Sequence, residues 1–206
     1  MRFIHTADIH LDYSSGNNEE RRLDIYNALA TITRAVRERS VEAVVIAGDL
    51  FHSIRPTNRS MAFLLSRLMT DLQDENVIII GGNHDTPKSD NVCSPLDILS
   101  FVDNVVCEYR CYNNTRVNDC LFHLVPYTND RNIMNDRLAQ ANTEFDPGLI
   151  NILVMHPSVF GVPVLQYDDL VLQEPELKKL SKKFDYIALG HYHGTKEVFD
   201  LSLIHI

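Results

Sequence analysis

The sequence predicts an α/β protein. Three observations indicate this class: five short apolar runs recur along the chain, helix-like segments fill the intervals, and each run ends in polar residues. The chain has 206 residues, of which 45% are hydrophobic and 23% are charged, and this composition is ordinary for a globular protein. A disordered or fibrous chain is therefore excluded.

Strands are expected where β-branched runs are bounded by glycine or polar residues. The five main runs lie at 2–4, 43–47, 77–80, 150–155 and 186–189. Residues 121–125 are expected to form a further strand, entered from a loop at 113–116.

Helices are expected between the strands, because apolar residues recur there at three- and four-residue steps. The expected helices span 20–39, 58–74, 94–101, 130–145 and 176–184. The third begins at Ser94-Pro95, a capping residue followed by proline at the first helical position. Strands that alternate with helices in this way predict parallel pairing with right-handed crossovers.

The charge balance bears on the class of partner. Nineteen basic and 28 acidic residues give a net charge of −9, which disfavours binding of nucleic acid through the overall field. The negative net charge does not exclude a nucleic-acid site whose positive charge comes from bound metal. No apolar run approaches the roughly 18 residues that span a bilayer, and the N-terminus turns polar too early for a signal peptide. We expect a cytoplasmic protein without membrane contact, whose four cysteines are free thiols.

Polar motifs follow the five expected strands. They are Asp8-x-His10, Gly48-Asp49, Gly82-Asn83-His84-Asp85, His156 and Gly190-His191-x-His193. Each fragment alone is compatible with an ordinary loop. Because ligands bind beyond the carboxyl ends of strands in such sheets, we expect the motifs to converge on one pocket. Their oxygen and nitrogen donors suit two divalent cations about 3.5–4 Å apart, of the kind that act on phosphoryl groups.

The ordered set of motifs resembles the calcineurin-like metallophosphoesterase signature and covers nearly the whole chain. Two stretches, His5-Thr6-Ala7-Asp8-Ile9-His10-Leu11-Asp12 and Gly48-Asp49-Leu50-Phe51-His52 followed by Ser53-Ile54-Arg55-Pro56, resemble the nuclease subunit of DNA double-strand-break repair complexes, the SbcD type. The resemblance implies a four-layer α/β/β/α sandwich that is truncated at its C-terminus. It also implies a dinuclear-metal enzyme, a DNA exonuclease or endonuclease that hydrolyses phosphodiester bonds by two-metal hydroxide attack.

The resemblance assigns roles residue by residue. Asp8, His10 and His193 would hold the first metal, Asp49 would bridge both, and Asn83, His156 and His191 would complete the second. His84 would contact the scissile phosphate and stabilise or protonate the leaving oxygen, and His52 would help orient the phosphate. The metals are expected to be two divalent ions, manganese first, with iron, zinc or magnesium as alternatives. Asp85 is expected to brace the turn, and His123 to be a core histidine.

The resemblance also sets expectations for domains and partners. The metallophosphoesterase domain would cover 1–200, with a tail of doubtful origin at 201–206, and the capping and ATPase-docking regions would be absent. DNA and an SMC-like repair ATPase subunit are the implied partners, near the nucleoid if the source is bacterial or archaeal. Helices near 58–74 and 94–102 would form a homodimer, although their apolar residues equally suit the chain's own core. Six arginines could form a basic rim around the site, or could equally be solvated surface charges: Arg21, Arg22, Arg55, Arg59, Arg131 and Arg137.

Two other functions compete with DNA cleavage. The same site could serve a phosphoesterase acting on a nucleotide, another small molecule or a phosphoprotein. A scaffold that lost turnover is the third possibility, and it predicts missing ligands, whereas every expected ligand is present.

Overall fold

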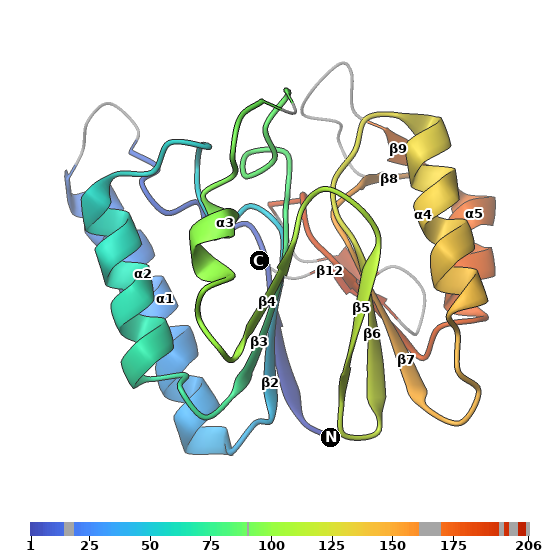
Figure 1. Ribbon diagram of the computed structural model, residues 1–206, viewed down its shortest axis with the longest axis horizontal. Helices are drawn as coiled ribbons and strands as arrows, with labels where there is room; N and C mark the ends of the chain where they lie inside the picture. The colour runs from blue at the N-terminus through green and yellow to red at the C-terminus, as the bar shows by residue number, and fades with distance from the viewer. Residues whose placement is uncertain (15–18, 90, 161–169, 194–195, 198–201, 205–206) are drawn as a thin grey trace.

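Four layers form the molecule in the computed structural model, which describes residues 1–14, 19–89, 91–160, 170–193, 196–197 and 202–204. Helices cover the outer face of each of two sheets, and the sheets pack face to face in the middle (Figure 1). The expected α/β/β/α sandwich is therefore confirmed. The helices are α1 (Glu19–Arg39), α2 (Asn58–Thr70), α3 (Leu96–Leu99), α4 (Arg131–Thr143) and α5 (Glu174–Ser181).

The first sheet has the order β1-β2-β3-β4, and all its pairs are parallel. Its strands are β1 (Phe3–Thr6), β2 (Ala43–Ala47), β3 (Asn76–Ile80) and β4 (Val105–Glu108). All five residues of β2 are buried, as expected for a central parallel strand covered on both faces.

The second sheet has the order β11-β12-β10-β7-β6-β5. Its strands are β5 (Asn113–Val117), β6 (Cys120–Val125), β7 (Ile150–Met155), β10 (Tyr186–Leu189), β11 (Lys196–Glu197) and β12 (Ser202–Ile204), while β8 (Ser158–Val159) and β9 (Val171–Leu172) form a separate pair. β6, β7, β10 and β12 run parallel, and β5 and β11 are antiparallel to their neighbours. β12 places residues 202–204 inside this sheet, while the origin of the tail stays a prediction.

The prediction of a loop at 113–116 is wrong, because these residues form β5. Val117 pairs with Cys120, so β5 and β6 make a hairpin with a two-residue turn at Asn118-Asp119. Asn118 has φ of +53°, which such tight turns require and asparagine tolerates. The polar run is compatible with a strand because β5 lies at the sheet edge with partly exposed side chains.

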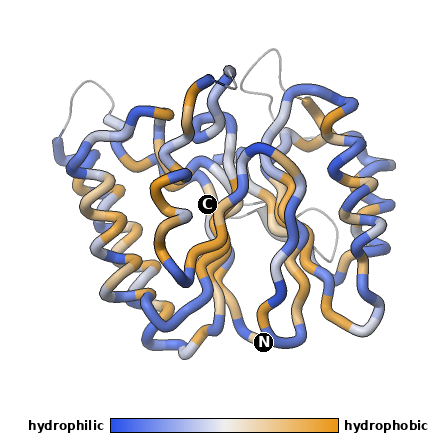
Figure 2. The backbone as a smooth tube through the Cα atoms, viewed as in Figure 1, coloured by the Kyte–Doolittle hydropathy of each residue, from blue (hydrophilic) through white to orange (hydrophobic). Residues whose placement is uncertain are grey.

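Three apolar layers hold the sandwich together, and they appear as orange segments on the strands and the inner helix faces in Figure 2. The middle layer joins the two sheets across Val45 and Ile78 on one side and Phe122 and Val154 on the other. Alanines at positions such as 43, 47 and 188 belong to the same layer. Their small side chains let the sheets approach closely, which brings the carboxyl ends of both sheets together.

The five main expected strands and all five expected helices are present, with helix ends displaced by a few residues. The third helix, expected over 94–101, is only one turn long at Leu96–Leu99. Within the described residues, no helix combines the length and apolarity that crossing a membrane would require.

Candidate metal centre

All seven expected metal ligands lie at the carboxyl ends of strands, but the strands belong to two sheets. Asp8, His10, Asp49 and Asn83 follow β1, β2 and β3 of the first sheet, whereas His156, His191 and His193 follow β7 and β10 of the second. The expected convergence is therefore observed, and the centre lies where the ends of the two sheets meet.

The turns that carry these ligands have unusual backbone conformations. Asp8, His10, Asp49 and His191 have φ values of 54°, 51°, 52° and 83°. Positive φ is rare for residues other than glycine, and such strain concentrates at functional sites. The conformation turns each chain sharply after its strand, and it is stabilised by bonds between the turns. Asp8 N, for example, donates to Gly48 O at 3.0 Å.

The first group of donors comprises Asp8, His10 and His193, whose ligand atoms lie within 4.8 Å of one another. His10 Nε2 is 2.9 Å from His193 Nε2, and His193 Nε2 is 3.7 Å from Asp8 Oδ1. The backbone N–H of His191 donates to both carboxylate oxygens of Asp8, at 3.1 and 2.9 Å, and fixes that carboxylate in place.

The second group comprises Asp49, His156 and His191, joined by Asn83. Asn83 Oδ1 lies 3.2 Å from His156 Nε2 and 3.0 Å from His191 Nδ1, so the amide oxygen and two imidazole nitrogens face one point.

Asp49 lies between the two groups. Its Oδ2 atom is 3.7 Å from His10 Nε2 and 3.4 Å from His156 Nε2, while Oδ1 accepts a hydrogen bond of 2.9 Å from His84 N. One carboxylate thus faces donors of both groups, as a ligand shared by two cations must.

Hydrogen bonding fixes how His156 presents its ring. Its Nδ1–H donates to the carbonyl oxygen of Ala47 at 2.6 Å, and the ring is fully buried. This leaves Nε2 directed at Asp49 and Asn83, and such a bond to the far nitrogen is how metal-binding histidines are oriented.

His84 and His52 lie beside the first group. His84 Nδ1–H donates to His52 O at 2.8 Å, and the ring centre of His84 is 4.8 Å from that of His10. The rings of His52 and His84 stack with centres 5.0 Å apart, and His52 Nδ1 is 3.5 Å from His10 Nδ1. Both expected catalytic imidazoles are therefore next to the expected metal ligands.

The pKa values of the donors reflect burial among carboxylates and imidazoles. Burial lowers the pKa of His10 to about 3, so this ring is neutral and able to bind a cation. Burial alone would lower the pKa of His156, but the Asp49 and Asp8 carboxylates raise it to about 9. Carboxylates that favour a proton on His156 Nε2 equally favour a cation at the same place. The donor set therefore fits divalent metal ions.

Asp85 braces the centre without belonging to it, as the sequence predicts. Its fully buried carboxylate accepts hydrogen bonds from Phe51 N at 2.8 Å and Leu50 N at 2.9 Å, with Gly82 N at 3.4 Å. Burial raises the pKa of Asp85 to about 7, with Asp49 adding to the shift. The bonds tie the turn after β3 to the turn after β2.

Four of the six arginines that could form a basic rim have partners or are buried. Arg137 is buried, Arg22 and Arg59 pair with Glu19, and Arg131 pairs with Glu176. All four cysteines are free thiols, as expected. His123 is a core histidine, bonded to Tyr112 OH at 2.8 Å and Asn151 Oδ1 at 3.1 Å.

Sequence reasoning missed Tyr127. Its ring lies 6.3 Å from that of His191 at an angle of 28°, and 6.4 Å from that of His156. The signal that the sequence offered was the position of Tyr127 just after the expected strand 121–125. The neighbouring residues share this position, so it does not single out Tyr127.

Comparison with known proteins identifies the family of this chain. A family model described as calcineurin-like phosphoesterase matches residues 1–195. The DNA double-strand break repair protein Mre11 of Methanocaldococcus jannaschii is 28% identical over 199 residues, which cover 94% of this chain and 51% of that protein. The same-named protein of Methanosarcina mazei is 36% identical over 206 residues, which cover 96% of this chain and 31% of that protein. This chain thus spans about half or less of the length of these relatives.

Proposed function

We propose that this chain, which belongs to the calcineurin-like phosphoesterase family, is a metal-dependent phosphodiesterase that cleaves DNA. Membership of the family makes it a hydrolase of phosphate esters. The observation that carries the proposal of metal-dependent cleavage is the position of Asp49 between two donor groups, with His84 and His52 alongside.

Two divalent ions, manganese in first place, are the proposed cofactors. Asp8, His10 and His193 would hold one ion, and Asn83, His156 and His191 the other, with Asp49 shared between them. The chemistry supplied by such ions when bound is polarisation of phosphoryl oxygens and acidification of water.

His84 is proposed to exchange a proton with the leaving oxygen. Because Nδ1–H of His84 is held by the His52 carbonyl, the Nε2 atom is the one available for this transfer. His52, stacked on His84, is proposed to orient the phosphate.

DNA is the favoured substrate because the relatives are named as DNA double-strand break repair proteins. A small phosphate ester is the second candidate. It is favoured by the net charge of −9 and by the pairing of arginines that would otherwise form a basic rim.

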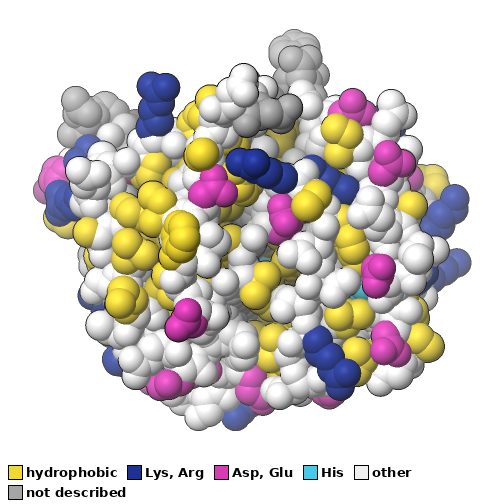
Figure 3. All heavy atoms as spheres, viewed as in Figure 1, with side chains coloured by type: hydrophobic (Ala, Val, Ile, Leu, Met, Phe, Trp, Pro, Cys, Tyr) yellow, Lys and Arg dark blue, Asp and Glu magenta, His cyan; other side chains and the backbone are white. Residues whose placement is uncertain are grey.

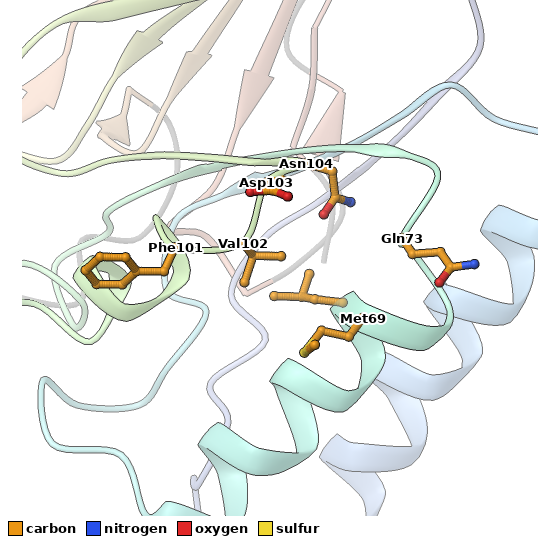
Figure 4. A pocket seen from close by; sticks show the side chains of 7 residues that line it. Met69, Gln73, Phe101, Val102, Asp103 and Asn104 are labelled. Carbon is orange, nitrogen blue, oxygen red and sulfur yellow. The ribbon is translucent and has the colours of Figure 1, made fainter.

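A homodimer is proposed through helices α2 and α3. Apolar side chains gather over these helices on the face shown in Figure 3. Met69, Ile98 and Phe101 are 64%, 48% and 86% exposed, and Met69 and Phe101 border a hollow of about 330 Å³ (Figure 4). A patch of this kind is typical of protein interfaces. A strictly monomeric mass in solution would contradict the dimer. An SMC-like repair ATPase is proposed as the further partner.

Cleavage assays test the proposed function. The metal-free protein is supplied with Mn²⁺ and given linear duplex DNA, single-stranded DNA or a chromogenic phosphodiester. We expect DNA cleavage only with metal, whereas preference for a small phosphomonoester over DNA would support the second candidate.

Variants separate metal binding from proton transfer. His84→Gln is expected to lower turnover about 10²–10⁴-fold while binding Mn²⁺ as wild type does, because this ring exchanges a proton and holds no ion. Asp49→Ala is expected to lose Mn²⁺ itself, since the Asp49 carboxylate faces His10 of one group and His156 of the other. Undiminished activity of His84→Gln would remove His84 from the reaction.

A further inference from the structure

Helix α4 contains an arginine that the proposed reaction does not use. Arg137 is only 7% exposed, although arginine is rarely buried without a specific purpose. Arg131, on the same helix, is exposed. It pairs with Glu176 at 2.8 Å and donates to Val171 O at 2.8 Å, away from the segments that Arg137 bonds. The two arginines differ in environment, so they allow a matched comparison.

The guanidinium of Arg137 bonds backbone carbonyls of two separate segments. Nη1 donates to Pro126 O at 2.8 Å and to Tyr127 O at 3.2 Å, in the segment between β6 and α4. Nη2 donates to Arg110 O, in the segment where the chain crosses from β4 of the first sheet to β5 of the second. The planar guanidinium thus clamps the crossing segment to the start of the loop after β6.

Tyr127 connects this clamp with the metal centre. Its backbone N–H donates to Gly81 O at 2.9 Å, two residues before the ligand Asn83. Its half-buried ring packs against the imidazoles of His156 and His191, at centre distances of 6.4 and 6.3 Å. Both distances lie within the range of favourable contacts between aromatic rings. Tyr127 therefore contacts two imidazoles of the second donor group through its ring, and its backbone bonds the turn that carries Asn83.

The first donor group has different supports. His10 packs against His52 and His84, and Asp8 is held by the backbone N–H of His191 rather than by the ring that Tyr127 contacts. A perturbation at Tyr127 is therefore expected to reach the two groups unequally.

We propose that Tyr127, held in place by Arg137, is a positioning residue that sets the affinity of the second donor group for its ion. Tyr127 limits the rotation of the His156 and His191 rings, and Arg137 fixes the backbone that carries Tyr127. Groups that orient metal ligands typically change metal affinity by about 10- to 100-fold when removed. This inference rests on the proposed dinuclear centre.

The test is a titration of the chelator-treated chain with Mn²⁺, followed by electron paramagnetic resonance to count bound ions and obtain the affinity of each. Wild type is expected to bind two ions. Tyr127→Leu and Arg137→Met are expected to keep one ion at the wild-type affinity and to bind the other about 10- to 100-fold more weakly. Tyr127→Phe, which keeps the ring, and Arg131→Met, which removes an exposed arginine from the same helix, are expected to bind both ions as wild type does.

The affinities of the two ions in the variants decide whether the inference holds. Two ions bound at the wild-type affinities in folded Tyr127→Leu would overturn the inference, and so would equal weakening of both ions. Circular dichroism reports whether each variant is folded, and if Arg137→Met unfolds, Tyr127→Leu decides alone. A wild-type chain that binds fewer than two ions would refute the dinuclear function itself, a failure visible before any variant is compared.

Discussion

Gly48, the residue before Asp49, gives a quantitative test of how tightly the centre is built. Its φ is +93°, and a Cβ added there would lie 2.6 Å from Cγ and 2.9 Å from Cε1 of the His156 ring. Gly48→Ala therefore meets two independent penalties, a backbone conformation that alanine rarely adopts and a collision with a fully buried imidazole. The first costs about 1–3 kcal/mol, and overpacking a filled interior costs about 1–3 kcal/mol more.

The sum predicts that Gly48→Ala lowers the free energy of unfolding by about 2–6 kcal/mol, a large share of a typical stability of about 5–15 kcal/mol. For a chain of this length, the melting temperature would fall by about 4–24 °C. Thermal and urea unfolding should be measured with a chelator present, so that weaker ion binding does not contribute. Gly148→Ala is the control, because its Cβ would meet only Asp146 Oδ1 at 3.2 Å. Equal stability of the two variants would refute the reasoning.

Three further predictions concern the fold and the ions. Phe122→Ala, which empties the layer between the sheets, should cost about 3–5 kcal/mol in urea unfolding, and a loss below about 1 kcal/mol would contradict the packing described. Burial lowers the pKa of His123 in the folded chain, so the unfolded chain binds more protons below about pH 6.5 and stability should fall as the pH decreases toward the folded pKa. His123→Gln should weaken this dependence between pH 7 and 5, and an unchanged slope would exclude His123 as its source. Finally, free Mn²⁺ at about 100 times its dissociation constant should stabilise the wild type by about 2.7 kcal/mol for each ion bound at that ratio, an increase that a chelator should abolish and that Asp49→Ala should not show.

Local sequence was sufficient for the elements that carry the ligands. The β-branched run Ala43–Ala47 predicts β2, and the polar residues that follow a strand necessarily lie at its carboxyl end. The convergence of Asp8, Asp49 and Asn83 could therefore be predicted, because all three follow parallel strands of one sheet. The role of Asp85 was predicted in kind, while its partners Leu50 N and Phe51 N were not.

The polar edge strand β5 could not be predicted in the same way, since pairing with β6 and the turn at Asn118 decide its conformation. Residues 113–116 form a strand instead of the expected loop because the backbone hydrogen bonds of the hairpin outweigh the weak preference of these polar residues for a loop.

The sequence by itself determined which side chains reach the end of their strands and hence the chemical nature of the centre. Only the tertiary structure decided that the ligands come from two sheets, that Ala47 orients His156, and that Arg137 and Tyr127 support the second group. The physical reason is the range of the contacts. A strand and the turn after it depend on neighbouring residues, whereas the contact of His10 with His193 joins positions 183 residues apart and exists only once both sheets have packed.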